Sequence, residues 1–394
     1  MDEAKENPLI MLPRSLVEAL FTSANREVER AKRRIIRLEE KIKDIQGLIA
    51  PIKIRGSRHG RILVADGSRP KGASERIGSD FSIYAAGFMV FDGKETIAED
   101  YEGGSISGIE DLSCLSILNR VLMAYAERKL ALEAFLKHNP DVVLLDGPFF
   151  FFRGKCKLIH DITFEEGYFK KALDIVNETK DITLELMKTG RAMCIIKRSI
   201  IRAIDGWLLL NKGEASCVGI RDKYILSKLM PPNTFWSYDA LLDYDPVIYS
   251  IAYRLAQIQK QKALKRDPKE LIEKAIKYRD REYEENLKIE FKELPKTKRY
   301  YVRYSNSVSP FEIEVVKGSD VEAFIEYFTD FYNPATGLPY PIDLIDQNVR
   351  LPEGTTTAFT EEVESMLIKD KLFLNKVAVS DYFKYLNPQK KELV

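Results

Sequence analysis

Two aspartates, Asp66 and Asp146, occupy the same local setting, because each ends a short apolar segment and is followed by glycine. The segments are RILVADGS at residues 61–68 and DVVLLD at residues 141–146, and both are typical of buried strands. A buried acid without a partner is unfavourable, and two acids that converge repel each other. A divalent cation resolves both problems, and hard carboxylate oxygens favour magnesium or manganese over zinc. Two such ions can activate water for phosphodiester hydrolysis.

Each aspartate on its own has a simpler explanation, because Asp-Gly is ordinary turn chemistry. The recurrence of the pattern at the ends of two strands favours a shared site over two independent turns. A third carboxylate is expected from the helix between these strands, and Glu127 and Glu133 are the candidates. Glu127 follows the apolar run LMAYA at residues 122–126, where a solvent-facing acid is less expected, so it is the preferred ligand. The alternative is an ordinary exposed helical glutamate.

Lys197 and Arg198 follow the apolar segment AMCII at residues 192–196, which predicts a further buried strand. Cations at a strand end could hold the scissile phosphate or offset charge in the transition state, and a solvated strand end is the equally weighted alternative. Aromatic side chains could stack on unpaired bases, although core packing is their more common fate. The aromatic candidates are Tyr84, the run at residues 149–152 and Trp236.

The elements that would position these residues follow from the pattern of apolar residues and turns. Strands are expected at residues 61–68, 81–91, 95–101 and 141–146, with a hairpin turn at Asp92-Gly93 and a glycine-rich loop at residues 103–108. A helix at residues 111–137 joins the third and fourth strands. The first three strands are therefore antiparallel, and the crossover makes the fourth parallel to the first. This mixed α/β sheet would bring both aspartates to one edge, where ligands bind in open α/β sheets.

Helices and short strands are expected on either side of this core. A long helix is expected at residues 14–46, with Ser15 as its N-cap and Glu18 completing a capping box. Its narrow apolar stripe suits either an arm packed on its own core or a helix that contacts a partner. The later elements are helices at 162–188, 245–258, 268–286 and 321–332, a loop at 230–236, a hairpin at 300–305 and 312–316, and a short helix from residue 340. We divide the chain into a helical arm (1–52), a main domain with helical insertions (53–351) and a C-terminal extension (352–394).

Composition disfavours several classes of protein. The chain has 394 residues and a net charge of +1, so any nucleic-acid surface must be a local patch. Four cysteines without a CxxC pair and three scattered histidines disfavour a zinc enzyme. The sequence lacks the GxxxxGKS/T motif of NTPases. It also lacks an apolar run of roughly 18 residues and a signal peptide, so we expect no membrane association and a cytoplasmic location. The charged fraction of 31% hints at a thermophile.

Taken together, these residues resemble the NurA family, the archaeal and bacterial nucleases that partner the HerA DNA translocase. The resemblance covers roughly residues 55–350. Its markers, in chain order, are VADGSR around Asp66, a helix that carries Glu127, LLDGP around Asp146, IIKRS around Lys197 and YPIDL from Tyr340.

The resemblance implies an RNase H-like fold and a DNA exonuclease that depends on manganese or magnesium, with two ions in its site. Such an enzyme would resect single- and double-stranded DNA ends in the 5′-to-3′ direction, with single-strand endonuclease activity as a further expectation. It would act as a homodimer docked to a HerA-type hexameric ATPase. The residues it assigns are Asp66, Glu127 and Asp146 as metal ligands, Lys197 in the active site, and Ser68, Arg69, Arg198 and Tyr340 in contact with substrate.

One position departs from the family pattern. The family often has histidine eight residues after the tyrosine, where this chain has Asn348, with Asp346 nearby. An asparagine carbonyl can bind a metal but cannot act as a general base near neutral pH. We therefore expect Asn348 as a metal ligand and Asp346 as the weaker candidate. Two alternatives stay open: a catalytically weak or inactive DNA-end clamp or translocase adaptor, and another RNase H-like enzyme, such as an RNA-directed nuclease or a transposase relative.

Overall fold

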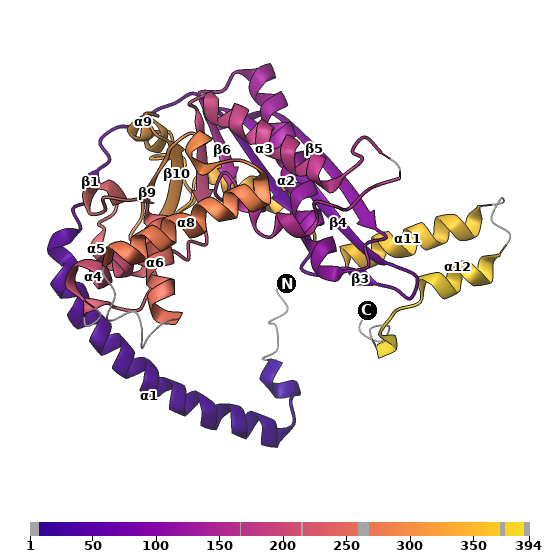
Figure 1. Ribbon diagram of the computed structural model, residues 1–394, viewed down its shortest axis with the longest axis horizontal. Coiled ribbons are helices and arrows are strands. Elements are labelled where there is room, and N and C mark those ends of the chain that lie inside the picture. The colour runs from indigo at the N-terminus through magenta and orange to yellow at the C-terminus, as the bar shows by residue number, and fades with distance from the viewer. Residues whose placement is uncertain (1–7, 166, 214–215, 259–267, 371–374, 390–394) are drawn as a thin grey trace.

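A ten-stranded mixed sheet forms the centre of the molecule (Figure 1). The computed structural model describes residues 8–165, 167–213, 216–258, 268–370 and 375–389. The strands lie in the order β1-β8-β9-β10-β7-β6-β2-β4-β3, and β5 pairs with β4. Their bounds are β1 Ile52–Lys53, β2 Arg61–Ser68, β3 Ser74–Glu75, β4 Asp80–Asp92, β5 Glu95–Ser107, β6 Val142–Asp146, β7 Ala192–Ile196, β8 Thr234–Ser237, β9 Thr297–Arg303 and β10 Phe311–Val316. Strand β6 is parallel to both β2 and β7, and the other pairs are antiparallel. The expected mixed α/β fold with a central mixed sheet is confirmed.

The three parallel strands are buried on both faces, which explains why their sequences are apolar runs without alternation. Alternate residues enter different cores. Leu63, Val143 and Cys194 lie in one core with α2 (Leu112–His138) and α3 (Ala172–Lys188). Ile62, Val142 and Met193 lie in another with α9 (Val321–Glu326) and α10 (Tyr340–Asn348). The sheet is therefore sandwiched between helices, and its strand ends are positioned from both sides.

Helix α2 crosses from β5 to β6, and its ends follow from local chemistry. The Asp111 carboxylate accepts hydrogen bonds from the amides of Ser113 and Cys114, so it caps the helix start. The helix stops at Asn139, which adopts a left-handed conformation with φ 47°. Because α2 packs against β2 and β4, its buried residues include Glu127 beside the strand that carries Asp66.

A separate core lies beyond β9 and β8, around Trp236. It gathers the C-terminal end of α1 (Arg14–Ile45) with α4 (Ala203–Lys212), α5 (Asp222–Leu229), α6 (Pro246–Ile258) and α8 (Pro268–Leu287). Figure 1 shows this end of α1 beside α4 and α5, while the rest of the helix extends away from the body. Among the described helices, none has both the length and the apolar character needed to cross a membrane.

The N-terminal helix starts at the expected residue but lacks the expected cap. It begins after Pro13, and no side chain caps it, so Ser15 lies inside the first turn and the expected capping box is wrong. Arg14 instead pairs with Glu18 at 2.9 Å across one helical turn. Of its residues, those buried are Leu38, Ile42 and Ile45 near the C-terminal end. Among the described residues, most side chains of this helix are therefore exposed.

Several other expected bounds are also wrong. Most of the expected glycine-rich loop belongs to β5, which ends at Ser107. Glycine fits at position 104 because a side chain there would collide with the Tyr84 ring of the neighbouring strand. The helix expected from residue 162 begins at Ala172, after an isolated bridge between Thr163 and Lys171. The expected loop at 230–236 contains β8, and the helix expected at 321–332 ends at Glu326. The described residues of the C-terminal extension form two helices, α11 (Thr355–Lys369) and α12 (Lys376–Phe383). Phe383 of α12 packs on Phe81 of β4.

Candidate metal centre

Three aspartates from separate elements meet at the carboxyl ends of the parallel strands. Asp66 lies near the end of β2, Asp146 ends β6, and Asp346 comes from the last turn of α10. Each offers a carboxylate oxygen within 4.8 Å of the other two. The two strand-end residues meet because β2 and β6 are parallel neighbours in register, with Ala65 opposite Leu145. Asp346 lies beside them because α10 packs its buried Ile342 and Ile345 onto the sheet.

The ammonium group of Lys197 lies among these carboxylates. Its Nζ is 3.7 Å from Asp66, 3.4 Å from Asp146 and 3.0 Å from Asp346. Burial alone would lower the pKa of Lys197, but Asp146 and Asp66 outweigh it and raise the pKa above its ordinary value. Lys197 therefore stays protonated at neutral pH and offsets part of the negative charge of the cluster.

The environment of Asp66 fits a ligand of a divalent cation. Its side chain is 3% exposed, and its Oδ1 accepts a hydrogen bond from the Gly67 amide at 2.7 Å. Its Oδ2 is buried and accepts no hydrogen bond. Burial, followed by the charge of Asp146, raises the pKa of Asp66 well above its usual range, while Lys197 opposes the shift. A buried carboxylate oxygen without a donor, next to two more carboxylates, matches the oxygen ligands that magnesium and manganese take.

Glu127 lies beside this cluster but outside the group whose oxygens are mutually within 4.8 Å. It is fully buried, and Arg128 donates to its Oε1 at 2.7 Å. Burial raises the pKa of Glu127 to about 7, Arg128 opposes this, and Asp146 adds to it. A Cβ atom at Gly67 would lie 3.2 Å from Glu127 Oε2, so Gly67 leaves the space in which the glutamate approaches β2. Glu133, the competing candidate, is exposed.

Helix α10 contributes Asp346 to the cluster, whereas its Asn348 points away from the cluster. Asn348 is exposed, and its Nδ2 donates to the Tyr101 hydroxyl on β5 at 2.8 Å. Residues two apart on a helix point about 200° apart, so they cannot both face the same site. Tyr340 begins the same helix, roughly 9 Å from Asp346 along its axis, and its ring packs on Phe331. Asp346 is thus the residue of this helix that joins the strand-end aspartates.

The expected substrate contacts are distributed around the cluster. The Ser68 hydroxyl accepts a hydrogen bond from the Leu351 amide at 3.4 Å, and Arg69 donates to the Ser116 hydroxyl at 3.2 Å. Arg198 is exposed beside Lys197. Trp236 and most of the aromatic run at residues 149–152 lie in the core, so these rings cannot stack on a nucleic-acid base.

Comparison of the whole chain with solved structures identifies the fold. The NurA nuclease from Sulfolobus solfataricus superposes with a TM-score of 0.53 at 17% sequence identity, over 92% of this chain and 100% of that one. The chain has a NurA-like fold. Two further crystal structures are similar over most of this chain: NurA (94% of this chain, 100% of that one, 11% identity, TM-score 0.47) and NurA with manganese (89%, 99%, 12%, 0.48). No protein-family model matches the chain, and no curated protein matches it significantly.

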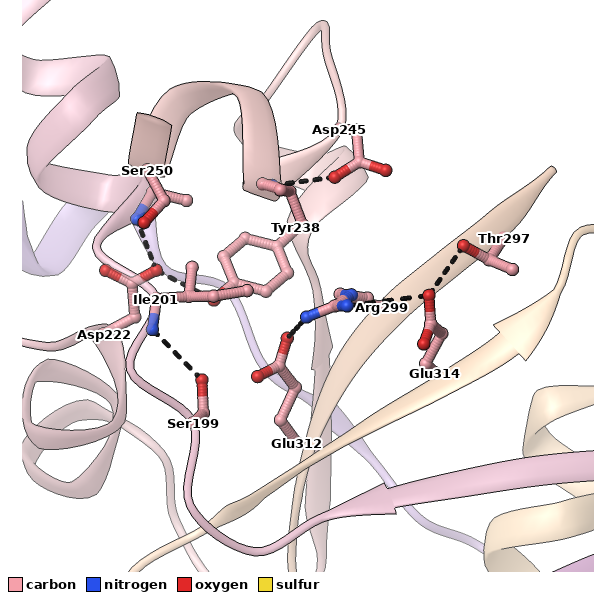
Figure 2. Close-up of polar contacts among 12 residues, drawn as sticks. Ser199, Ile201, Asp222, Tyr238, Asp245, Ser250, Thr297, Arg299, Glu312 and Glu314 are labelled. Atoms are coloured by element: carbon pink, nitrogen blue, oxygen red, sulfur yellow. Dashed lines mark hydrogen bonds and ion pairs between the residues drawn. The ribbon is translucent and has the colours of Figure 1, made fainter. Parts of the chain in front are cut away.

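Within this NurA-like fold, a buried ion-pair network supports the loop that follows Asp146. Arg299 of β9 lies 3.1 Å from Glu312 and 3.6 Å from Glu314, both on β10 (Figure 2). The second carboxylate also accepts a hydrogen bond from the Phe149 amide at 3.2 Å. The loop itself turns at Gly147, whose φ of +72° favours glycine. The network thus restrains the backbone three residues after Asp146.

Two residues that support the site, Arg128 and Arg299, were not predicted from the sequence. Arg128 is fully buried on α2, and Arg299 is held between two carboxylates. A signal existed for the first of them, because the adjacent charges Glu127-Arg128 interrupt an apolar helix. Arg299 had no comparable signal, because its strand carries several charged residues whose burial depends on tertiary packing.

Proposed function

We propose that this protein is a metal-dependent nuclease that hydrolyses phosphodiester bonds in DNA. The observation that carries the proposal is the meeting of three carboxylates from β2, β6 and α10, with a buried Asp66 oxygen that lacks a hydrogen-bond donor. Oxygen-rich clusters of this kind suit magnesium or manganese and phosphoryl chemistry. The NurA-like fold supports the same reaction class, although fold by itself does not determine function.

The proposed roles follow from burial and charge. Asp66, Asp146 and Asp346 would hold the cation, with Glu127 beside them as a further ligand. A bound manganese or magnesium ion, or a pair of them, would activate the attacking water and stabilise the leaving oxygen. Lys197 keeps its proton at neutral pH, so its ammonium group would contact a non-bridging oxygen of the scissile phosphate.

The resemblance to the NurA family suggests more specific properties for this nuclease. We infer an RNase H-like core, an exonuclease that degrades single- and double-stranded ends from 5′ to 3′, and single-strand endonuclease activity. We further infer a homodimer that works with a HerA-type hexameric translocase in DNA end resection. The exposed α1 supports the partner-binding alternative for residues 1–52, with residues 53–351 as the nuclease domain and 352–394 as an extension.

The test is hydrolysis of end-labelled linear DNA by the purified protein in EDTA, magnesium or manganese. Asp66→Asn should abolish cutting while the protein still binds DNA in EDTA. Asp92→Asn is the matched control, because it makes the same chemical change on an exposed side chain at the opposite end of β2 and β4. Cutting that survives in Asp66→Asn, or that needs no metal, would exclude this metal centre.

A second function, an inactive DNA-end clamp or translocase adaptor, is favoured by one observation. Lys197 already contacts all three aspartates and so supplies positive charge where a cation would bind. Asn348, at the position where the family often has histidine, is hydrogen bonded to Tyr101 rather than to the cluster. Calorimetric titration with manganese separates the two functions. The nuclease requires saturable binding that Asp66→Asn removes, whereas the adaptor requires neither binding nor hydrolysis.

A further inference from the structure

A basic groove begins at the metal centre and runs toward α1. Its volume is about 690 Å³, which is large enough for an extended ligand rather than a single ion. In the described part of the chain, no aspartate or glutamate lines it. Its six basic side chains are Arg34, Lys197, Arg198, Arg202, Arg221 and Lys223.

The floor of this groove is held in place by the buried carboxylate of Asp222. Its two oxygens accept hydrogen bonds from the amides of Ala203 and Ile204 at 2.8 and 3.2 Å, and its Oδ2 accepts another from the Tyr238 hydroxyl at 2.8 Å. The backbone amide of Asp222 also donates to the Ile201 carbonyl at 3.0 Å. These bonds fix the start of α4 against the start of α5 without using any of the basic side chains.

Within the described ranges of the chain, the basic side chains of the groove other than Lys197 are not paired with a carboxylate, whereas Lys197 pairs with three aspartates. Among the described residues, Arg198, Arg202 and Arg221 form no ion pair. Arg34 donates to the Gly219 carbonyl at 2.8 Å and Lys223 to the Lys197 carbonyl at 3.0 Å, and neither acceptor is charged. Asp222 already occupies the first amides of α4, so the positive field comes from the side chains. Because the whole chain carries a net charge of only +1, this groove is a local concentration of positive charge.

We propose that this groove binds the phosphate backbone of one nucleic-acid strand and leads that strand to Lys197; the proposal rests on the nuclease function above. A polyanion is the ligand that a groove with several unpaired cations fits, and each cation that neutralises a phosphate releases counterions. Tyr224 is the aromatic side chain among the described lining, so stacking contributes little and contacts go to phosphates. Binding in the groove is therefore independent of base sequence.

The test measures binding of a fluorescein-labelled single-stranded oligothymidylate by the full chain in EDTA, where metal-dependent cutting is prevented. Arg198→Gln/Arg221→Gln removes two exposed groove charges. Each lost contact with a single-strand phosphate should make the slope of log affinity against log salt shallower by about 0.7, so the double variant should lose about 1.4. The affinity of this variant near 0.1 M salt should therefore fall by about 25-fold. Arg198→Lys/Arg221→Lys should restore most of the slope, because it restores both charges.

The matched control is Lys137→Gln/Lys317→Gln, which removes the same charge from exposed side chains at the opposite end of the strands. It should leave the slope unchanged. Absence of oligonucleotide binding by the parent protein, or equal slopes for the groove and control variants, would overturn the proposal. A parent that binds with the expected slopes but cuts no DNA in any metal would support the groove and reject the nuclease function. A parent protein that cuts DNA, combined with equal salt slopes for the groove and control variants, would support the nuclease function and reject the groove.

Discussion

The ammonium nitrogen of Lys197 lies 3.0 Å from Asp346, and so links the end of β7 to the last turn of α10. The same nitrogen approaches the two strand-end aspartates, so one cation holds together three carboxylates that would otherwise repel each other. This arrangement makes the charge balance of the site depend on Lys197 when no metal is bound. Metal binding and Lys197 should therefore partly substitute for one another in stabilising the fold.

Lys197→Met should lower the melting temperature in EDTA and increase the rise that manganese produces. Removing one partner from a buried ion pair costs about 3–5 kcal/mol, and the partial exposure of Lys197 makes this an upper bound. Differential scanning fluorimetry in EDTA and in manganese measures both quantities. Lys228→Met is the control, because its ion pair with Glu39 is exposed and should contribute little. If manganese raised the melting temperature equally in the parent and in Lys197→Met, the metal and the Lys197 ammonium group would not replace each other.

Arg128→Met should destabilise the protein strongly, and a second substitution should recover most of the loss. Arg128 and Glu127 are both buried, so removal of the arginine leaves an unpaired carboxylate in the core at a cost of about 3–5 kcal/mol. The double variant Glu127→Gln/Arg128→Met removes the charge that was left without a partner. Urea denaturation gives the free energy of unfolding for each variant. Additive losses would mean that the two side chains act independently of each other.

The meeting of Asp66 and Asp146 could be predicted because it depends on local patterns. Apolar runs defined the strands, the hairpin turn and crossover helix set their directions, and parallel neighbours end at the same edge. The choice between Asp346 and Asn348 could not be made in the same way. Both lie in one short helix, and tertiary packing of its buried face determines which side chain turns toward the strands.

Elements that depend on distant packing were the ones that the sequence did not reveal. Strand β8 spans only four residues that follow two prolines, so its sequence resembles a loop. It is a strand because β1 and β9 pair with it and Trp236 is buried. The basic groove is a similar case. Its side chains come from α1, from the segment after β7 and from the start of α5, and their convergence depends on the Asp222 hydrogen bonds.

Stability should depend on Glu285 at low pH. Hydrogen bonds from Lys157 and then Arg281 lower the pKa of this carboxylate from its ordinary value to about 2. Because the folded-state pKa is lowered, its contribution is fully present above the unfolded value near 4.5 and is lost as the pH falls toward 2. Glu285→Gln should remove this part of the pH dependence, as measured by urea denaturation between pH 5 and about 2. Glu284→Gln, on the next residue of the same helix, is the control and should leave the profile unchanged.

Gly67→Ala should reduce hydrolysis as well as stability. The added methyl group would lie 2.8 Å from Met123 Cγ and 3.2 Å from Glu127 Oε2, so the buried glutamate and methionine must move. Overpacking of this kind costs about 1–3 kcal/mol. The Glu127 oxygen must move by a few tenths of an ångström. Because a displacement near 1 Å in a catalytic site can lower the rate on the order of 100-fold, this smaller movement should lower the rate by roughly 10-fold. Hydrolysis rates in manganese and urea denaturation, compared with Gly154→Ala, which meets no atom within 4 Å, separate the two effects. Full activity in Gly67→Ala would remove Glu127 from the proposed site, because its carboxylate cannot keep its present position beside that methyl group.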